Sequence, residues 1–454
     1  MSFPRYPEHK DSGIDWLGKV PVHWKLRKIA WHIPYSVGWT PPSGREEYYD
    51  GDYLWVTIAD LNKPVIYDTR SKITQKAVAD RGGKLSPAGS MLFSFKLTVG
   101  NVSFLGEPAY TNEAIASFEP NEQIDLKYWR YAAPQFIPRF GRENIYGALL
   151  LNQEMIGSVR FYAPDIQEQN LISKFLDHET ARIDALVEEQ QRLIKLLKEK
   201  RQAVISHAVT KGLDHDVPMK DSGVEWLGEV PAHWRVASLK HAFEVVADVD
   251  HYMPSSVDSG VPYVMTGDLR RLASEIDMGS CKQITREEFL KLSRKIRTSK
   301  GDVIMARYAT IGSVSYVDID AEFIVSYSCV TIRPQAELAS GIYLFLYFQS
   351  DAFIKGISNM INANTQENVG IGDLKEVKAA LPNVHEQKVI VHELELKLTE
   401  LDRIIKTSRA TIRLLIERRA VLISAAVTGK IDVRGWQPPT GSSALAENSQ
   451  METV

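Results

Sequence analysis

Apolar residues recur at helical spacing over two long stretches of the chain, residues 164–210 and 382–428. Neither stretch contains glycine, and each has its single proline at its first position. If Leu176 is taken as an a position, steps of seven give a stripe of Ile183, Gln190, Leu197 and Val204, with Leu186 and Leu193 at the neighbouring seam position. A heptad stripe of this length predicts a coiled-coil helix, a rod of roughly 60 Å, rather than a helix buried in a core.

The second stretch repeats the first at a distance of 218 residues. This shift carries Glu168 to Glu386 and Asp184 to Asp402, and it carries the seam onto Leu394, Leu401, Ser408, Leu415 and Leu422. The one polar a position falls at the same level in both copies, as Gln190 and Ser408, and isolated polar seam residues commonly fix the register of a coiled coil. We therefore expect two helices that pair with each other as an antiparallel coiled coil, within a duplicated chain.

A shorter motif is repeated ahead of each long stretch. Residues 11–24, DSGIDWLGKVPVHW, return as residues 221–234, DSGVEWLGEVPAHW, with ten of the fourteen positions identical. We call this the tryptophan motif, because its two tryptophans in each copy are large apolar anchors. His23 and His233 have no serine, cysteine or paired carboxylate repeating beside them. We therefore interpret both histidines as packing residues rather than catalytic ones.

Between each tryptophan motif and its long helix lies a segment of short apolar runs. Bounded by turn residues, these runs predict strands at residues 53–58, 90–95 and 102–105, and then at 263–265, 303–306, 314–317 and 324–332. The two segments resemble each other only faintly, for example where WVTIADL (residues 55–61) is echoed by YVMTGDL (residues 263–269). We interpret each segment as a compact mixed α/β domain.

The predicted fold class is therefore α+β, with two pseudo-symmetric mixed α/β domains separated by two long helices that pair. The expected boundaries are residues 1–163 for the first domain, 164–212 for its helix, 213–380 for the second domain, 381–432 for its helix and 433–454 for a disordered tail.

Composition narrows the class of protein only a little. The chain has 454 residues, too many for one core, and 44% of them are hydrophobic. No apolar signal region or run of roughly 20 apolar residues is present, so we expect a cytoplasmic protein with no membrane contact. Two cysteines, Cys281 and Cys329, form neither a disulfide framework nor a metal-ligand spacing. The net charge of −3 is neutral evidence on nucleic acid, because a total hides local patches.

No catalytic or metal-binding motif stands out in the sequence. Gly83-Lys84 is followed by leucine rather than serine or threonine, so there is no Walker A loop. Asn-Pro-Pro-Tyr and Asp-Pro-Pro-Tyr, which would hold the target amine of an amino-methyltransferase, are missing, and no zinc or EF-hand spacing occurs. We therefore expect a chain that is non-catalytic by itself and binds no metal or cofactor.

The plan of tryptophan motif, variable domain and long helix, present twice, resembles the specificity subunit of type I restriction–modification enzymes. The resemblance runs from about Pro7 to Asp432. Its carriers are the W-L-G-x-x-P-x-H-W motifs, the P-x-x-x-E-Q helix starts at residues 164–169 and 382–387, and the helix ends ISHAVTKG and ISAAVTGK.

This resemblance implies a set of functions and partners. Each variable domain would be a target recognition domain that reads one half of a split double-stranded DNA sequence. The paired helices would set the gap between the halves and dock two methyltransferase subunits. Those subunits would bind S-adenosylmethionine and methylate adenines, and motor-nuclease (restriction) subunits would join them to cut unmodified DNA.

Base reading favours Arg or Lys for guanine and Asn or Gln for adenine, with a basic surface for phosphates. On that basis the candidate DNA-binding residues are Arg70, Lys72, Lys96, Thr98 and Asn101 in the first domain, and Arg270, Arg271, Lys300, Arg307, Tyr308, Thr310, Asn362, Asn364 and Gln366 in the second. We predict that Arg307→Ala relaxes or abolishes recognition of one half-site only.

A coiled-coil adaptor that does not read DNA is the alternative hypothesis. It would account for the long helices, but it gives no reason for two dissimilar strand-rich domains. Retention of DNA by the isolated chain, with an affinity that falls as salt rises, would favour the reader over the adaptor.

Overall fold

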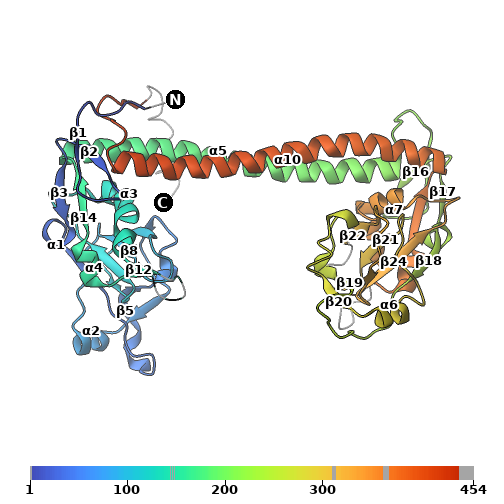
Figure 1. Cartoon of the computed structure of the whole chain (residues 1–454), viewed down its shortest axis with the longest axis horizontal. Coiled ribbons are helices and arrows are strands. Elements are labelled where there is room, and N and C mark those ends of the chain that lie inside the picture. Colours follow the sequence, from blue (N-terminus) through green and yellow to red (C-terminus); the bar gives the residue numbers. More distant parts are fainter. Residues whose placement is uncertain are drawn as a thin grey trace. The chain divides into compact units, whose positions relative to one another are not determined.

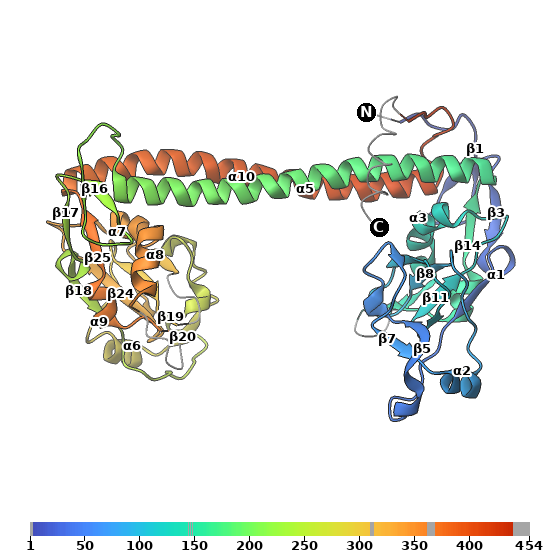
Figure 2. The ribbon, with the colours of Figure 1, turned by 180° about the vertical axis from the view of Figure 1, so that it is seen from behind.

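The structure is a computed structural model that describes residues 3–438, except residues 144, 146, 148, 309–312 and 361–367. Figure 1 shows two strand-rich domains and two long helices, and Figure 2 shows the same ribbon from behind. The chain divides into two compact units: residues 1–189 with 411–454 form unit 1, and residues 190–410 form unit 2. Each unit therefore combines one strand-rich domain with one half of each long helix.

The two long helices are α5 (Ile166–Lys211) and α10 (Val384–Val427), close to the predicted ranges. Both begin in the same way, because the side chains of Asp165 and Asn383 each accept the backbone N–H of the glutamate three residues later, at 2.9 Å. Both are followed by a glycine in the left-handed region, Gly212 with φ 79° and Gly429 with φ 73°. The same start and stop signals explain why the two copies have nearly the same length.

Within each unit the halves of α5 and α10 pack side by side in opposite directions, as the repeat predicts (Figures 1 and 2). In unit 1 the predicted seam residues Leu176, Ile183 and Leu422 are buried in the main core. In unit 2 Leu197 and Leu401 form a small cluster of their own with neighbouring isoleucines. The predicted stripe is therefore the contact face of the helix pair.

The neighbouring seam position was predicted wrongly. Leu186 and Leu193 are 44% and 37% exposed and do not lie in the seam. The second stripe lies four residues after each first-stripe position rather than three, at Thr180, which is buried, and at Val187 and Ile194, which are half-buried. Leu176 therefore occupies a d position rather than an a position, because a four-residue step to the next buried position follows d.

Each tryptophan motif folds as a small antiparallel hairpin. The strands are β1 (His9–Asp11) with β2 (Lys19–Pro21), and β15 (Met219–Asp221) with β16 (Glu229–Pro231). The strand that follows each motif then pairs with the strand that precedes each long helix: β3 (Lys25–Lys28) with β14 (Arg160–Ala163), and β17 (Arg235–Ser238) with β25 (Lys378–Leu381). These pairs place the end of each tryptophan motif beside the start of its helix.

The strand-rich part of unit 1 contains two further main sheets. The central sheet has the order β4 (Tyr35–Val37), β11 (Ile115–Phe118), β8 (Met91–Ser94), β9 (Val102–Leu105) and β6 (Val65–Ile66). The second sheet has the order β10 (Tyr110–Thr111), β5 (Tyr49–Val56) and β7 (Ser71–Ile73), and β12 (Arg142–Glu143) pairs separately with β13 (Leu149–Leu150). The short helices are α1 (Ile29–His32), α2 (Gln75–Arg81), α3 (Leu126–Phe136) and α4 (Gln153–Ser158).

Unit 2 repeats this topology despite its different sequence, but among the described residues it has no strand that corresponds to β6 or to the β12–β13 pair. Its central sheet has the order β18 (Phe243–Ala247), β24 (Cys329–Pro334), β21 (Val303–Ala306) and β22 (Val314–Tyr316), and its second sheet β20 (Lys282–Ile284), β19 (Val261–Val264) and β23 (Ile324–Val325). The short helices are α6 (Arg286–Leu292), α7 (Gly341–Tyr347), α8 (Asp351–Ser358) and α9 (Ile371–Glu376). In both units the second sheet joins one parallel and one antiparallel neighbour to its middle strand.

Two sequence-based boundaries need correction. The run predicted as one strand, residues 324–332, is two strands, because a turn with Cys329 N–H bonded to Ser326 O sends β23 and β24 into different sheets. The predicted disordered tail also begins too early, since Val433 is buried and Trp436 stacks edge-on against Phe175 at 5.6 Å. The first error comes from a turn inside an apolar run, and the second from a tertiary contact, and local composition reports neither.

The core of each unit runs without a break from the domain into the helix pair. In unit 1 it includes Trp24, Trp129 and residues of both long helices, and in unit 2 it includes Trp234, Tyr343 and again both helices. Within the described part of the chain, no helix combines the length and apolar character that a membrane crossing needs.

Candidate nucleic-acid interface

Glu168, in the first turn of α5, fastens the first tryptophan motif to the helix. Its carboxylate accepts hydrogen bonds from the Tyr6 hydroxyl at 2.6 Å and from Trp24 Nε1 at 3.1 Å, and it lies 2.8 Å from His23 Nε2. Burial, followed by the hydrogen bond and charge of Glu168, raises the pKa of Tyr6, so its hydroxyl stays a donor. We call this arrangement the glutamate clamp.

The second tryptophan motif has the same clamp with one member fewer. Glu386 accepts from Trp234 Nε1 at 2.9 Å and lies 2.9 Å from His233 Nε2. Both histidines therefore bind the helix-start glutamate, which refines the prediction that they are packing residues. The clamp explains why the tryptophan motif and the P-x-x-x-E-Q helix start occur together in both copies.

The glutamine of the P-x-x-x-E-Q sequence has an equally defined position. Gln169 donates to Pro164 O at 2.9 Å and accepts the backbone N–H of Asp125, the residue that caps α3. Gln387 donates to Pro382 O at 3.0 Å and accepts the backbone N–H of Ser340, which caps α7. The glutamine therefore joins the helix start to the first domain helix that covers the central sheet.

Three of the predicted DNA-binding residues of unit 1 lie in the hairpin loop between β8 and β9. Lys96, Thr98 and Asn101 are all exposed there. Hydrogen bonds hold the loop: Gly100 N–H and Ser94 N–H bond to Ser94 O and Asn101 O, both at 2.9 Å. The loop therefore presents polar side chains to solvent on a fixed backbone.

Two other candidates of unit 1 lie beside the second sheet. Arg70 is exposed, and its backbone N–H is bonded to Asp60 at 3.2 Å. Lys72 lies on β7 and forms a surface ion pair with Asp68 at 3.2 Å. Surface ion pairs of this kind contribute little, so Lys72 keeps its charge available to a phosphate at small cost.

In unit 2 the predicted cations fall into two groups. Arg270 and Lys300 are exposed, and Arg270 contacts the backbone carbonyls of its own loop, the nearest being Leu269 O at 2.9 Å. Arg271 instead turns toward the helices, where its Nη1 lies 3.1 Å from the Asp402 carboxylate. Arg271 is therefore engaged with α10 in this structure.

Arg307 does not occupy the exposed position that its predicted role requires. The residue is buried, its Nε donates to Val369 O at 2.6 Å, and its guanidinium is ion-paired with Asp248. The sequence gives no measure of burial at this position, which is apolar in the other copy. With Thr98 set against Thr310, Arg307 corresponds to Phe95, which is also buried. Tyr308 beside it is half-buried.

The remaining candidates, Thr310, Asn362, Asn364 and Gln366, lie outside the described residues. They stay predictions from the sequence.

Each unit has a cleft between its domain and its half of the helix pair. The cleft of unit 1 has a volume of about 900 Å³ and that of unit 2 about 470 Å³. Residues at corresponding positions of the repeat line the two clefts. The pairs, with the unit 1 residue first, are Leu61 and Leu269, Asn62 and Arg270, Lys63 and Arg271, Asn101 and Ser313, Val102 and Val314, Tyr131 and Phe345, Gln135 and Gln349, Asp184 and Asp402, and Arg419 and Arg201. The duplication has therefore preserved the place of the cleft while changing its side chains.

A repeated ion pair crosses the helix seam at the back of each cleft. Arg201 Nε lies 3.2 Å from Asp402 in unit 2, and Arg419 Nε lies 2.9 Å from Asp184 in unit 1. Burial, together with the nearby Arg271, lowers the pKa of Arg201 below its usual value. The sequence repeat relates Asp184 to Asp402, but their arginine partners were not predicted from it. The same 218-residue shift relates the two arginines and was the signal that could have found them.

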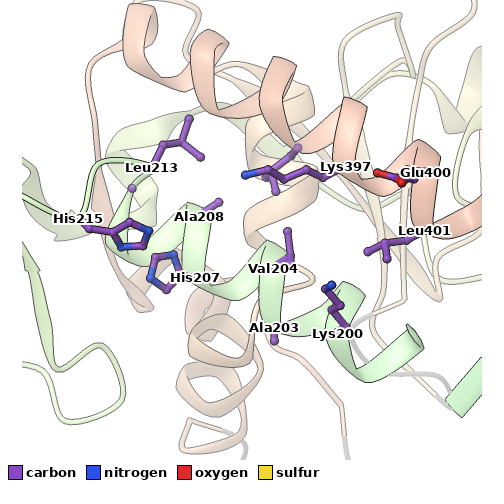
Figure 3. A pocket seen from close by; sticks show the side chains of 12 residues that line it. Lys200, Ala203, Val204, His207, Ala208, Leu213, His215, Lys397, Glu400 and Leu401 are labelled. Carbon is purple, nitrogen blue, oxygen red and sulfur yellow. The ribbon is translucent and has the colours of Figure 1, made fainter. Parts of the chain in front are cut away.

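A groove of about 570 Å³ lies in unit 2 between the end of α5 and the start of α10 (Figure 3). Leucine, valine and alanine side chains line it together with charged and histidine side chains. Among its residues are Lys200, Val204, His207, Leu213, His215, Lys397, Glu400 and Leu401. The rings of His207 and His215 are 5.3 Å apart, and burial lowers the pKa of His207. At the start of α5 in unit 1, which corresponds to the start of α10 in unit 2, aromatic side chains pack on the helix instead. Phe3 and Trp436 both contact Phe175 there.

Comparisons of the sequence and of the fold with known proteins agree on one family. The family model described as the type I restriction modification DNA specificity domain matches residues 21–196 and again residues 235–414. The chain belongs to this family. The two matches coincide with the two copies of the repeat, so each unit contributes one specificity domain.

Named relatives cover most of the chain. The MjaVIII specificity subunit of Methanocaldococcus jannaschii is 20% identical over 92% of this chain and 95% of its own length. The EcoBI specificity subunit of Escherichia coli is 20% identical over 76% of this chain and 73% of its own length. Both are subunits of type I restriction enzymes, and the chain is likewise a DNA specificity subunit with two target recognition domains, itself non-catalytic.

Solved structures show the same fold. A chain from a study of the complex assembly and conformational transition of the type I R-M system matches with a TM-score of 0.63 and 15% identity, over 91% of this chain and 99% of that one. The HsdS subunit of Thermoanaerobacter tengcongensis matches with a TM-score of 0.53 and 15% identity, over 91% and 98%. The hypothesis of an adaptor that does not read DNA is therefore set aside for this specificity subunit, on the family match.

Proposed function

We propose that each target recognition domain of this specificity subunit reads one half of a split double-stranded DNA sequence, and that the helix pair sets the gap between the halves. The observation that carries the proposal is the duplication itself. The glutamate clamp, the strand order and the place of the cleft repeat in both units, whereas the side chains of the loops and clefts differ. A repeated scaffold with two different surfaces fits two different half-sites.

The exposed cations and amides support contact with DNA. Of the predicted residues, Arg70, Lys72, Lys96, Thr98, Asn101, Arg270 and Lys300 have side chains that reach the surface. Arginine, lysine and asparagine are the side chains that read base edges and neutralise phosphates. We assign these residues to the DNA surface and withdraw Arg307 from it.

The test is a methylome. The specificity subunit is co-expressed with a methyltransferase subunit of the same restriction–modification system, and host DNA is sequenced for modified adenines. We expect one split motif with two defined halves and a fixed gap. A stable complex that adds no modified motif would contradict the proposal. Removing or adding one turn in both α5 and α10 should change the gap, and an unchanged gap would contradict the role of the helices.

We also propose that one methyltransferase subunit docks on each unit, with S-adenosylmethionine bound by the methyltransferase. The helix pair exposes corresponding leucines, Leu196 in unit 2 and Leu414 in unit 1, which are 51% and 59% exposed. Lys200 and Ala203, which follow Leu196 at helical spacing, line the groove of Figure 3. An exposed leucine at corresponding positions of the two units suits a partner that binds twice. Restriction subunits would then join this complex.

Leu196→Glu and Leu414→Glu test the docking surface. Each variant should lose one of two bound methyltransferase subunits, measured by native mass spectrometry, because a charge is placed at the centre of an apolar contact. Leu290→Glu is the matched control, since Leu290 is 54% exposed on α6, away from the helix pair. If both helix variants retained two methyltransferase subunits, the docking role of Leu196 and Leu414 would be contradicted. The proposal that the domains read DNA would be unaffected.

A further inference from the structure

Leu97, in the hairpin loop between β8 and β9, combines two unfavourable properties. Its side chain is 90% exposed, and its backbone has a φ of 60°. Among the described residues, the other non-glycine residue with positive φ is Asp50. Aspartate tolerates the left-handed region, because its short polar side chain bonds locally, but leucine there brings its Cβ against the backbone. A strained apolar residue in solvent does not stabilise the fold.

The loop holds Leu97 in this conformation from both sides. Ser94 accepts the backbone N–H of Gly100, and the Ser94 hydroxyl donates to Lys96 O at 3.1 Å. On the far side of the tip, Val99 packs against the core of unit 1. The loop therefore packs Val99 inward and directs Leu97 outward. Strain that the surroundings impose on an exposed residue is a common feature of binding sites.

The neighbours of Leu97 indicate what it would contact. Lys96 and Asn101 are exposed on the same loop, and Gly100 and Asn101 form part of the wall of the unit 1 cleft. That cleft also contains the cations Lys63, Arg130 and Arg419 against the acids Asp177 and Asp184. A lysine and an amide around an apolar tip suit a nucleic acid, where phosphates lie beside apolar base faces and thymine methyl groups.

We propose that Leu97 is a DNA-contacting residue of the first target recognition domain, an apolar tip that packs against bases of its half-site while Lys96 lies by the phosphates. The proposal rests on the proposed DNA-reading function and extends it to a residue that no base-recognition rule selects. The second domain has alanine at the corresponding position, Ala309 in the sequence, so the two half-sites are not read alike at this point.

Two variants separate the backbone strain from the side-chain contact. Leu97→Ala removes the apolar tip and keeps a Cβ in the left-handed region, whereas Leu97→Gly removes both. DNA affinity of the complex with its methyltransferase should fall about tenfold in both variants, the usual effect of losing one base-pair contact. In Leu97→Gly alone, the urea midpoint of the complex should rise, because the strain is relieved. Better folding with weaker DNA binding is the expected signature.

The measurement uses duplexes that carry the split motif of the wild-type complex, with single base-pair changes in each half. The variants should lose discrimination in one half only, the same half that Lys96→Ala weakens. Leu85→Ala is the control, because Leu85 is exposed in the same domain but has ordinary backbone geometry. Wild-type affinity and discrimination in both Leu97 variants would overturn the proposal, as would loss of methyltransferase binding instead of DNA binding. A wild-type complex that modifies no split motif would refute the proposed function itself.

Discussion

The two units share a skeleton but fasten their recognition domains to the helices differently. In unit 1 the Tyr131 hydroxyl donates to Asp177 of α5 at 2.7 Å, and Arg130 pairs with the same carboxylate. In unit 2 a loop of the second sheet adds a contact, where Arg271 reaches Asp402 of α10. Gln202 and Ser206 of α5 also bond to Asp351, at the start of α8. Lys63, which corresponds to Arg271, forms no ion pair within the described residues.

This difference separates two kinds of position in the repeat. The clamp glutamates Glu168 and Glu386 bond the tryptophan motif of their own copy, so neither residue can change without its partners. The cleft residues differ between the units, as they must if the two clefts face two different half-sites in the proposed function. The repeat is therefore close at the glutamate clamps and loose along the clefts.

The largest expected loss of stability comes from substituting Arg307 or Phe95, two buried residues at corresponding positions. Arg307→Ala leaves the Asp248 carboxylate without its guanidinium, and breaking a buried ion pair costs about 3–5 kcal/mol. Phe95→Ala should cost a similar amount, about 3–5 kcal/mol, by leaving a cavity. Hydrogen exchange resolved by unit would measure both. Normal protection of unit 2 in Arg307→Ala, with loss of one half-site, would instead restore Arg307 to the DNA surface.

The next effect tests the corrected seam. Leu176→Ala and Leu394→Ala each remove a fully buried side chain from corresponding positions, so each should lower the free energy of unfolding by about 3 kcal/mol. Leu186→Ala and Leu193→Ala should change it by less than about 0.5 kcal/mol, because these side chains are exposed. Urea denaturation distinguishes the two pairs. Equal losses at all four positions would return Leu186 and Leu193 to the seam.

The glutamate clamps should differ in strength between the units. Glu168→Ala leaves the buried donors of Tyr6 and Trp24 unpaired, and we expect a loss of about 2 kcal/mol. Glu386→Ala should cost about 1 kcal/mol, because Glu386 and His233 are more exposed and water replaces part of the lost bonding. Glu168→Gln, which keeps an acceptor, is the control for the first variant. A larger loss in Glu386→Ala than in Glu168→Ala would contradict this ranking.

The smallest effect concerns the contact between Arg271 and Asp402. The pair is partly exposed, so Arg271→Gln should cost less than about 1 kcal/mol of stability. We expect it to loosen the second domain on its helix half, so that methylation of targets with a gap altered by one base pair rises a few-fold relative to the native gap. Lys63→Gln is the matched control and should leave gap discrimination unchanged. Equal gap discrimination in both variants would show that the ion pair positions nothing.

The sequence by itself determined the duplication, the two long helices, the fold class and the family. Those features follow from periodicity and from identical motifs at fixed distances, and both are properties of a linear chain. Helix starts and ends were predictable because Asp165, Asn383, Gly212 and Gly429 act on their own neighbours. The strands of the two domains were placed well where apolar runs end in turn residues, as at β9 and β21.

Only the tertiary structure decided which side chains remain available to DNA. Arg307 and Arg271 look like Arg70 and Arg270 in the sequence, yet one is buried against Asp248 and another is paired with Asp402. Leu97 was not selected, because neither its positive φ nor its exposure can be recognised from its residue type. The physical reason is that burial, ion pairing and backbone strain depend on residues distant in sequence, whereas periodicity and capping depend on near neighbours.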